Sequence, residues 1–243
     1  MHVLRLILFS AVIAGGIVGL AVTAVQHLGT VPLILKAEVY ERASEASPSQ
    51  SVASAEHAQH QHSQDQHGQH RHSEEAWTPQ DGLERTAFTA AANILTAIGF
   101  GLVLCGIFAV RGPGDWYEGL LWGLAGFVVF TVAPGLGLPP TLPGIPTAEL
   151  EARQLWWIAT AASTAAGLAL LFFRRSPLAA IIALCLLALP HVIGSPQPDD
   201  AHTHVPQALS RQFVAAVTFT SLFFWSLLGS LTSIAYRRLS TAE

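Results

Sequence analysis

The chain has 243 residues, and only 12% of them are charged, about half of the roughly 25% that is usual in soluble proteins. This depletion predicts an integral membrane protein whose main partner is the lipid bilayer, with no role in binding nucleic acid. The only lysine, Lys36, lies outside any glycine-rich phosphate loop, and the chain has no HExxH or GxSxG sequence, so neither a nucleotide site nor a hydrolytic enzyme is expected.

Long apolar segments predict one all-α membrane domain over residues 1–243. About 20 residues at roughly 1.5 Å per residue cross a hydrocarbon layer of about 30 Å. The segments that reach or approach this length are 6–25, 87–110, 117–134, 155–173, 177–194 and 212–235. Because 117–134 and 177–194 are short, either can be tilted, broken or partly re-entrant. We expect a bundle of about six transmembrane helices, with five as the alternative.

The first apolar segment also has features of a cleaved signal peptide. Arg5 precedes it, and the small residues of Val22-Thr23-Ala24 follow its apolar core. That core is about 20 residues long, against the roughly 7–15 of a signal sequence, so we expect a retained helix. Gly15 and Gly19 form a GxxxG pattern, which suits close helix packing in lipid.

A first set of candidate metal ligands follows this span. His27 lies where the helix leaves the bilayer, and Gly29 and Pro32 interrupt the chain after it. Glu38 and Glu41 then lie one helical turn apart on one face of a short amphipathic segment. An imidazole with two carboxylates suits a divalent cation. The alternative is that His27 caps the helix and the glutamates face water.

A second set lies in segment 44–80, which we expect to be a disordered extracytoplasmic loop because its polar composition cannot form a core. Its histidines are His57, His60, His62, His67, His70 and His72. Repeated imidazoles in a flexible segment predict capture of a transition-metal ion. The alternative is a solvated linker whose histidines bind nothing.

The proline-rich segment 134–146 and the Trp156-Trp157 pair indicate a rigid connection that ends at a membrane interface. We interpret this stretch as an outer cap or gate. An ordinary rigid connection is the alternative.

A third set of candidate ligands consists of His191, Asp199, Asp200, His202 and His204. Pro190 should bend the fifth span and free a backbone carbonyl where His191 enters the membrane edge. Ionisable groups at that depth are costly and usually functional, so His191 is the preferred residue for an ion path. Alternatively, His191 only forms hydrogen bonds to the following loop.

Charge asymmetry predicts the orientation. With the N-terminus in the cytoplasm, the short inner segments carry Arg5, Arg111, Arg174, Arg175, Arg237 and Arg238. The short outer loops carry only Arg153 and Arg211, as the positive-inside rule requires. Both termini are then cytoplasmic. Thirteen of the sixteen acidic residues and ten of the eleven histidines fall at the outer face, where they would concentrate divalent cations.

Several of these segments resemble the CbtA family of predicted cobalt transporter subunits. The resemblance lies in His27 to Glu41 with its ending Ala37-Glu38-Val39-Tyr40-Glu41, in Ala133-Pro134-Gly135-Leu136-Gly137-Leu138-Pro139-Pro140, in Ala152-Arg153-Gln154-Leu155-Trp156-Trp157, and in Leu189-Pro190-His191-Val192-Ile193-Gly194-Ser195-Pro196. It implies a protein of the bacterial inner membrane that takes up cobalt for cobalamin synthesis. It also implies a second, small membrane protein as partner, with a single span and histidines of its own, and about five spans in the present chain.

We therefore expect a permease for Co²⁺, with Ni²⁺ as a second substrate and no permanently bound cofactor. Imidazole and carboxylate ligands would prefer Cu²⁺ on affinity alone, so selectivity must come from geometry or supply. Since only neutral histidine binds metal, capture should weaken as the pH falls below about 6.5. The alternatives are a metal sensor or buffer that moves no ion and, less well supported, a cytochrome with His27 and His191 as haem ligands.

Overall fold

The computed structural model describes residues 2–45, 79–80, 82–112, 114–200 and 202–241. The elements in chain order are α1 His2–Leu28, α2 Val31–Glu45, α3 Leu83–Arg111, α4 Trp116–Phe127, the π-helix η1 Val128–Val132, α5 Ala133–Gly137, α6 Leu150–Phe173, α7 Pro177–Ile193 and α8 Gln207–Thr241. The described residues contain no strand, which confirms the all-α prediction. The predicted loop 44–80 lies almost wholly outside the described residues.

Five helical stretches are long and apolar enough to cross a membrane. They are α1, α3, the continuous stretch Trp116–Gly137, α6 and α8. The chain is therefore a multi-pass membrane protein. The remaining apolar helix, α7, has 17 residues and is about 25 Å long, somewhat less than a typical hydrocarbon layer. The sixth predicted segment, 177–194, is thus a helix, but a shorter one than the other five.

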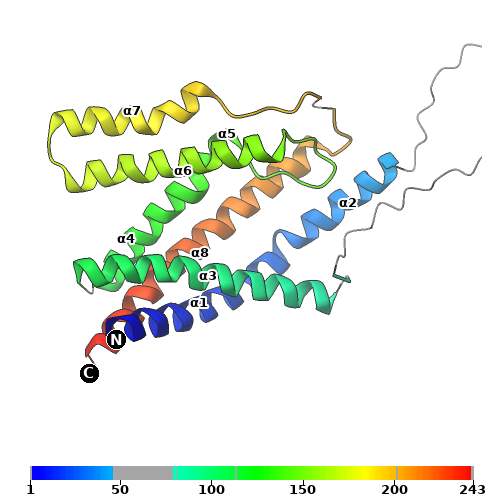
Figure 1. Cartoon of the computed structure of the whole chain (residues 1–243). Coiled ribbons are helices and arrows are strands. Elements are labelled where there is room, and N and C mark those ends of the chain that lie inside the picture. Colours follow the sequence, from blue (N-terminus) through cyan, green and yellow to red (C-terminus); the bar gives the residue numbers. More distant parts are fainter. Residues whose placement is uncertain (1, 46–78, 81, 113, 201, 242–243) are drawn as a thin grey trace, which may run out of the picture.

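The helices form two layers with α4 and α8 crossing between them (Figure 1). In one layer α1 packs against α3, and in the other α6 packs against α7. The N- and C-termini lie at the same end of the molecule as the α3–α4 and α6–α7 connections, which we call the terminal end. The opposite end carries α2 and the connections α5–α6 and α7–α8, and we call it the loop end.

Glycines allow α1 to approach α3 closely. A Cβ on Gly15 would lie 2.7 Å from the backbone nitrogen of Ile98, and a Cβ on Gly19 would lie 2.5 Å from the Cα of Ile94. Any side chain at these positions would push the helices apart, as in other small-residue interfaces in lipid. The expected GxxxG contact is confirmed.

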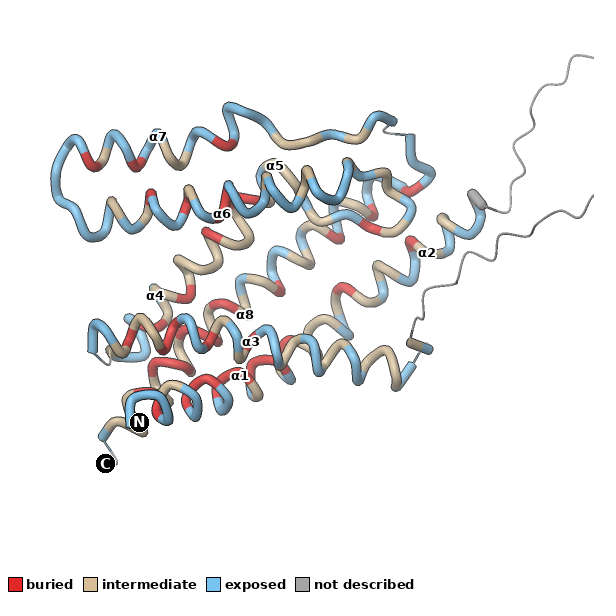
Figure 2. The backbone as a smooth tube through the Cα atoms, in the orientation of Figure 1, coloured by how far each residue is buried: buried red, intermediate tan, exposed pale blue. Residues whose placement is uncertain are grey.

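A second glycine contact joins α4 to α8. A Cβ on Gly119 would lie 2.4 Å from the carbonyl oxygen of Gly229, and one on Gly123 would lie 2.1 Å from that of Trp225. Buried residues gather where α1, α3, α4 and α8 meet, whereas α6 and α7 remain largely exposed (Figure 2). The core of the molecule therefore lies in the first layer and the two crossing helices.

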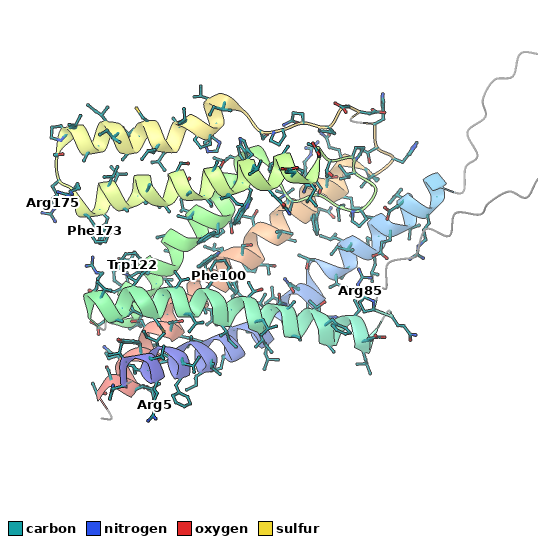
Figure 3. All side chains as sticks on the ribbon, in the orientation of Figure 1. Arg5, Arg85, Phe100, Trp122, Phe173 and Arg175 are labelled. Atoms are coloured by element: carbon teal, nitrogen blue, oxygen red, sulfur yellow. The ribbon has the colours of Figure 1, made fainter. Side chains whose placement is uncertain are left out.

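At the terminal end, polar contacts fix the helix ends. The Arg237 guanidinium donates to the Asp115 carboxylate, and the Ser233 hydroxyl donates to the Gly114 carbonyl at 2.9 Å. The guanidinium of Arg111 lies over three aromatic rings, 5.7 Å from the centroids of Trp122 and Phe173 and 5.2 Å from that of Phe172. Trp122 and Phe173 are labelled in Figure 3. Cation–π contacts of this kind join α3 to the crossing helix α4 and to α6.

At the loop end, α2, two connections and the start of α8 form a small apolar cluster, which we call the cap. Its buried members are Ala37, Leu142, Val205, Leu209 and Phe213. The Thr203 hydroxyl donates to the Gly144 carbonyl at 2.9 Å and ties the α7–α8 connection to the α5–α6 connection. Segment 134–146 contributes Leu142 to this cluster, and its role as an outer cap or gate stays a prediction.

The π-helix η1 precedes Pro134. Pro134 has no N–H and its ring clashes with the carbonyl one turn earlier, so regular α-helical geometry is unfavourable in the turn before it. The chain adopts a wider π turn instead, in which the Ala133 N–H donates to the carbonyl of Val128. Short π segments occur often at functional sites, and this one contributes residues to the cleft described below.

Candidate functional site

The residues of the first predicted ligand set, His27, Glu38 and Glu41, do not come together, and each has different surroundings. The Glu38 carboxylate lies 3.0 Å from Arg85 and 3.5 Å from Arg42, and its side chain is 18% exposed. The pair with Arg85 ties α2 to the start of α3, and the pair with Arg42 lies within α2. A metal ion at Glu38 would have to compete with both guanidinium groups. Glu41 packs in the cap beside Gly144, and His27 is exposed in the last turn of α1.

The third predicted set is spread along the loop end. The His191 ring lies 6.1 Å from the Trp156 ring in an edge contact at 72°. The helix α7 continues through Pro190 to Ile193, so His191 remains helical. The backbone N–H of His202 donates to the Asp200 carboxylate at 2.9 Å, and the two side chains are 98% and 73% exposed.

The remaining members of this set, Asp199 and His204, are also exposed. Within the described ranges, no three histidine, cysteine or acidic side chains lie close enough together to hold a metal ion. The six loop histidines from His57 to His72 lie outside those ranges. The candidate ligand sets stay predictions, and a site with three protein ligands would need residues from more than one of them to move together.

A different polar feature lies inside the bundle, where α1, α3, η1, α6 and α8 surround a cleft of about 250 Å³. The polar residues that line it are Gln26, Asn93, Thr96, Thr131, Thr220 and Ser221. Aromatic residues form much of the rest of the wall: Phe100, Phe130, Trp157, Phe224 and Trp225. Phe100, which is labelled in Figure 3, projects from α3 at the centre of the bundle.

Hydrogen bonds determine how the amide of Asn93 is oriented. The Thr23 hydroxyl donates to the Gly19 carbonyl at 2.7 Å, so its oxygen can only accept from Asn93. Asn93 Nδ2 donates to that oxygen at 3.0 Å and to Gln26 Oε1 at 2.7 Å. Both amide hydrogens are then used. Asn93 Oδ1 accepts no hydrogen bond from any residue that the structure describes.

The aromatic residues of the cleft pack on one another. The ring of Trp225 stacks on Phe130 with centroids 5.4 Å apart and contacts Phe100 at 4.7 Å. Phe130 in turn stacks on Trp157 at 6.0 Å, and Phe224 meets Trp225 edge-on at 5.3 Å. The rings therefore form a rigid wall that links η1, α3, α6 and α8.

The lining of the cleft is neutral. None of its lining residues is acidic, basic or a histidine. Thr96 on α3 and Trp157 on α6 are both exposed, so the cleft is open on the side between these two helices. It can accept hydrogen bonds and present aromatic faces, but it cannot neutralise a charge.

Sequence reasoning missed this cleft. The strongest available signal was Asn93, which is the only asparagine of the chain and falls within the predicted span 87–110. A polar amide inside a membrane span is costly and usually functional. The other lining residues carry no such signal, because single threonines, serines and aromatics are common in membrane helices.

Comparison with known proteins identifies one family. The family model described as Probable cobalt transporter subunit (CbtA) matches residues 4–237, nearly the whole chain. No curated protein and no solved structure matches the chain.

Proposed function

Because the chain belongs to the Probable cobalt transporter subunit (CbtA) family, we propose that it takes up a divalent transition-metal ion, first of all cobalt, into the cell. The match over residues 4–237 carries this proposal, since it covers all or nearly all of every candidate span. By its description the family is one of transporters rather than enzymes. A supply of cobalt for cobalamin synthesis is the use that we propose for the ion.

The orientation that we propose has both termini in the cytoplasm of a bacterial inner membrane. Support comes from the terminal end, where the two termini and the arginine-bearing connections lie together (Figure 1). Most of the acidic residues and histidines that the structure describes belong to the loop end, whereas His2, Asp115 and Glu118 belong to the terminal end. In this arrangement α7 provides the sixth crossing, because it runs back from the terminal end to the loop end beside α6.

The route that we propose has two stages. Imidazoles of the loop, with His27, His202 and His204, gather the ion at the loop end. His191 is the proposed residue through which the ion passes, and Glu38, Glu41, Asp199 and Asp200 add negative charge near the entry. The cleft inside the bundle is the second stage. Passage through such a path requires contacts that are weak enough to permit release.

We also propose a partner for the open side of the cleft. Polar groups that face hydrocarbon are unfavourable, so the opening between Thr96 and Trp157 needs a cover in the membrane. A small single-span membrane protein, the second component that the family resemblance implies, would supply one helix there. Transport would then need both chains, whereas metal capture at the loop end would need only this one.

Uptake of radiolabelled cobalt into metal-starved cells that lack other importers tests the proposal. The variants are the intact chain, His191→Ala and a deletion of residues 56–75, each with and without the candidate partner. We expect uptake that requires His191 and that survives the loop deletion once external cobalt is raised. Metal binding without uptake under any condition would instead indicate a sensor or buffer.

A further inference from the structure

The neutral lining of the cleft sets a limit on the form in which a metal ion can enter it. Removing the water shell of a divalent ion is very costly unless charged ligands replace it. The cleft offers amides, hydroxyls and aromatic rings, and none of its lining residues is charged. A bare ion would therefore be held far less well there than in water.

The unused groups of the cleft are hydrogen-bond acceptors. Asn93 Oδ1 receives no donor from the described residues, and Gln26 Oε1 keeps one lone pair after accepting from Asn93. The hydroxyls of Thr96, Thr131 and Ser221 line the same space and have no protein hydrogen-bond partner within the described part of the chain. Water molecules bound to a metal ion direct their hydrogens outward and therefore need hydrogen-bond acceptors around them. The amide and hydroxyl oxygens of the cleft are acceptors of this kind.

The size of the cleft agrees with this chemistry. About six waters at roughly 30 Å³ each occupy about 180 Å³, which a cleft of about 250 Å³ can contain. Ring faces attract a cation within about 6 Å of their centroids, and the attraction does not require removal of its waters. The rings of Phe130 and Trp225 face each other, and Phe130 also stacks on Trp157, so these rings shape the wall of the cleft and leave the binding of the ion to the oxygen atoms.

We propose that the cleft binds a divalent metal ion together with its shell of water, through hydrogen bonds from the shell to Asn93, Gln26 and the free hydroxyls. The choice of cobalt as the ion rests on the proposed function, but the binding of a hydrated cation does not. No protein atom coordinates the metal in this site. The affinity is accordingly modest, and the ion can leave without exchange of its ligands.

A consequence concerns selectivity. Direct imidazole coordination follows the Irving–Williams order, whereas a site that contacts only the water shell distinguishes ions by charge and hydrated size. The cleft should therefore treat Co²⁺ and Ni²⁺ alike. Discrimination between them belongs to the loop end or to the partner.

Hexaamminecobalt(III) provides the test, because it is an octahedral cation whose ammine ligands point hydrogens outward and do not exchange. Its binding to the full chain in nanodiscs is measured by equilibrium dialysis, and its inhibition of Co²⁺ uptake is measured in proteoliposomes. The variants are Asn93→Leu, Thr131→Val and Ser221→Ala. Thr164→Val is the matched control, because Thr164 is a buried threonine of α6 outside the cleft.

We expect the complex to bind and to compete with Co²⁺. Each cleft substitution should weaken its binding by about three- to tenfold, the value of one lost hydrogen bond, and Thr164→Val should leave it unchanged. Thr131→Val and Ser221→Ala keep the test valid if Asn93→Leu does not fold. Uptake of Co²⁺ without competition, or equal binding to all variants, would overturn the inference. Binding that depends on the cleft but without any Co²⁺ flux would refute the transport function and leave the site intact.

Discussion

The loop end and the cleft differ in the chemistry that they offer to a cation. The loop end carries carboxylates and imidazoles, and where the structure describes them they are exposed or already paired, as Glu38 is with Arg42 and Arg85. The cleft has no charge but retains several acceptors and a rigid aromatic wall. Charge and imidazole suit capture from dilute solution, whereas neutral oxygens suit brief passage. The comparison indicates that capture of the ion and its passage belong to different parts of the protein, the loop end and the cleft.

A positive charge placed in the cleft should have the largest effect. Asn93→Lys would put an ammonium group beside the proposed ion position, where repulsion between unit charges near 4 Å is about 4 kcal/mol at an effective dielectric constant of about 20. We expect cobalt uptake to fall by more than about 100-fold, while metal binding at the loop end remains. Uptake assays on membranes with matched protein levels check this. Normal uptake by the variant would show that the ion does not pass through the cleft.

The second largest effect is expected from a change of pH, which should alter metal binding at the loop end but not in the cleft. Histidine binds metal only when neutral, so Co²⁺ capture by the full chain should weaken as the pH falls below about 6.5. The cleft lining has no group that titrates between about pH 5 and 8, so binding of hexaamminecobalt(III) there should stay constant. Equilibrium dialysis of both ions across this range checks the difference. A parallel loss of both would contradict the assignment of a neutral site.

A smaller effect is expected from Glu38→Gln at the loop end. The substitution removes the charge from the Arg85 pair, which is half-buried and joins α2 to α3. We expect a loss of about 1 kcal/mol in stability, seen as a lower midpoint of thermal unfolding, with cleft binding unchanged. Asp199→Asn, in the exposed connection, is the control and should leave the midpoint of thermal unfolding unchanged. An unchanged midpoint for Glu38→Gln would mean that its carboxylate is available for another role.

The smallest expected effect is that of Thr164→Val. The Thr164 hydroxyl is buried in α6, and the described residues provide it with no hydrogen-bond partner. Replacing it with a methyl group of similar size should be neutral or should stabilise by up to about 1 kcal/mol. Uptake and thermal unfolding of the variant are the measurements. A clear loss of uptake would show that polar groups outside the cleft also take part in the path.

The apolar helices could be predicted well because each depends on its own composition. The segment predicted as 177–194 is Pro177–Ile193, and the GxxxG pattern indicated the contact of α1 with α3. The shape of the third span was less predictable, since Pro134 marks an end while the helical stretch continues to Gly137 through a π turn.

The cleft and the ion pair of Glu38 with Arg85 could not be predicted from the sequence, because both depend on contacts between distant parts of the chain. The Glu38–Arg85 pair joins residues that are 47 positions apart, and the cleft combines residues from five elements. Each of these residues is ordinary in its own segment. The function depends on their arrangement, and only the single asparagine gave a local indication of it.

The most direct test is cobalt flux into sealed proteoliposomes that contain the purified chain, with and without the single-span partner. The account predicts that cobalt accumulates when both chains are present and that Asn93→Lys abolishes this accumulation while metal binding at the loop end persists. Metal binding without any accumulation, or accumulation that is indifferent to Asn93→Lys, would contradict the claim that this protein carries cobalt through the cleft.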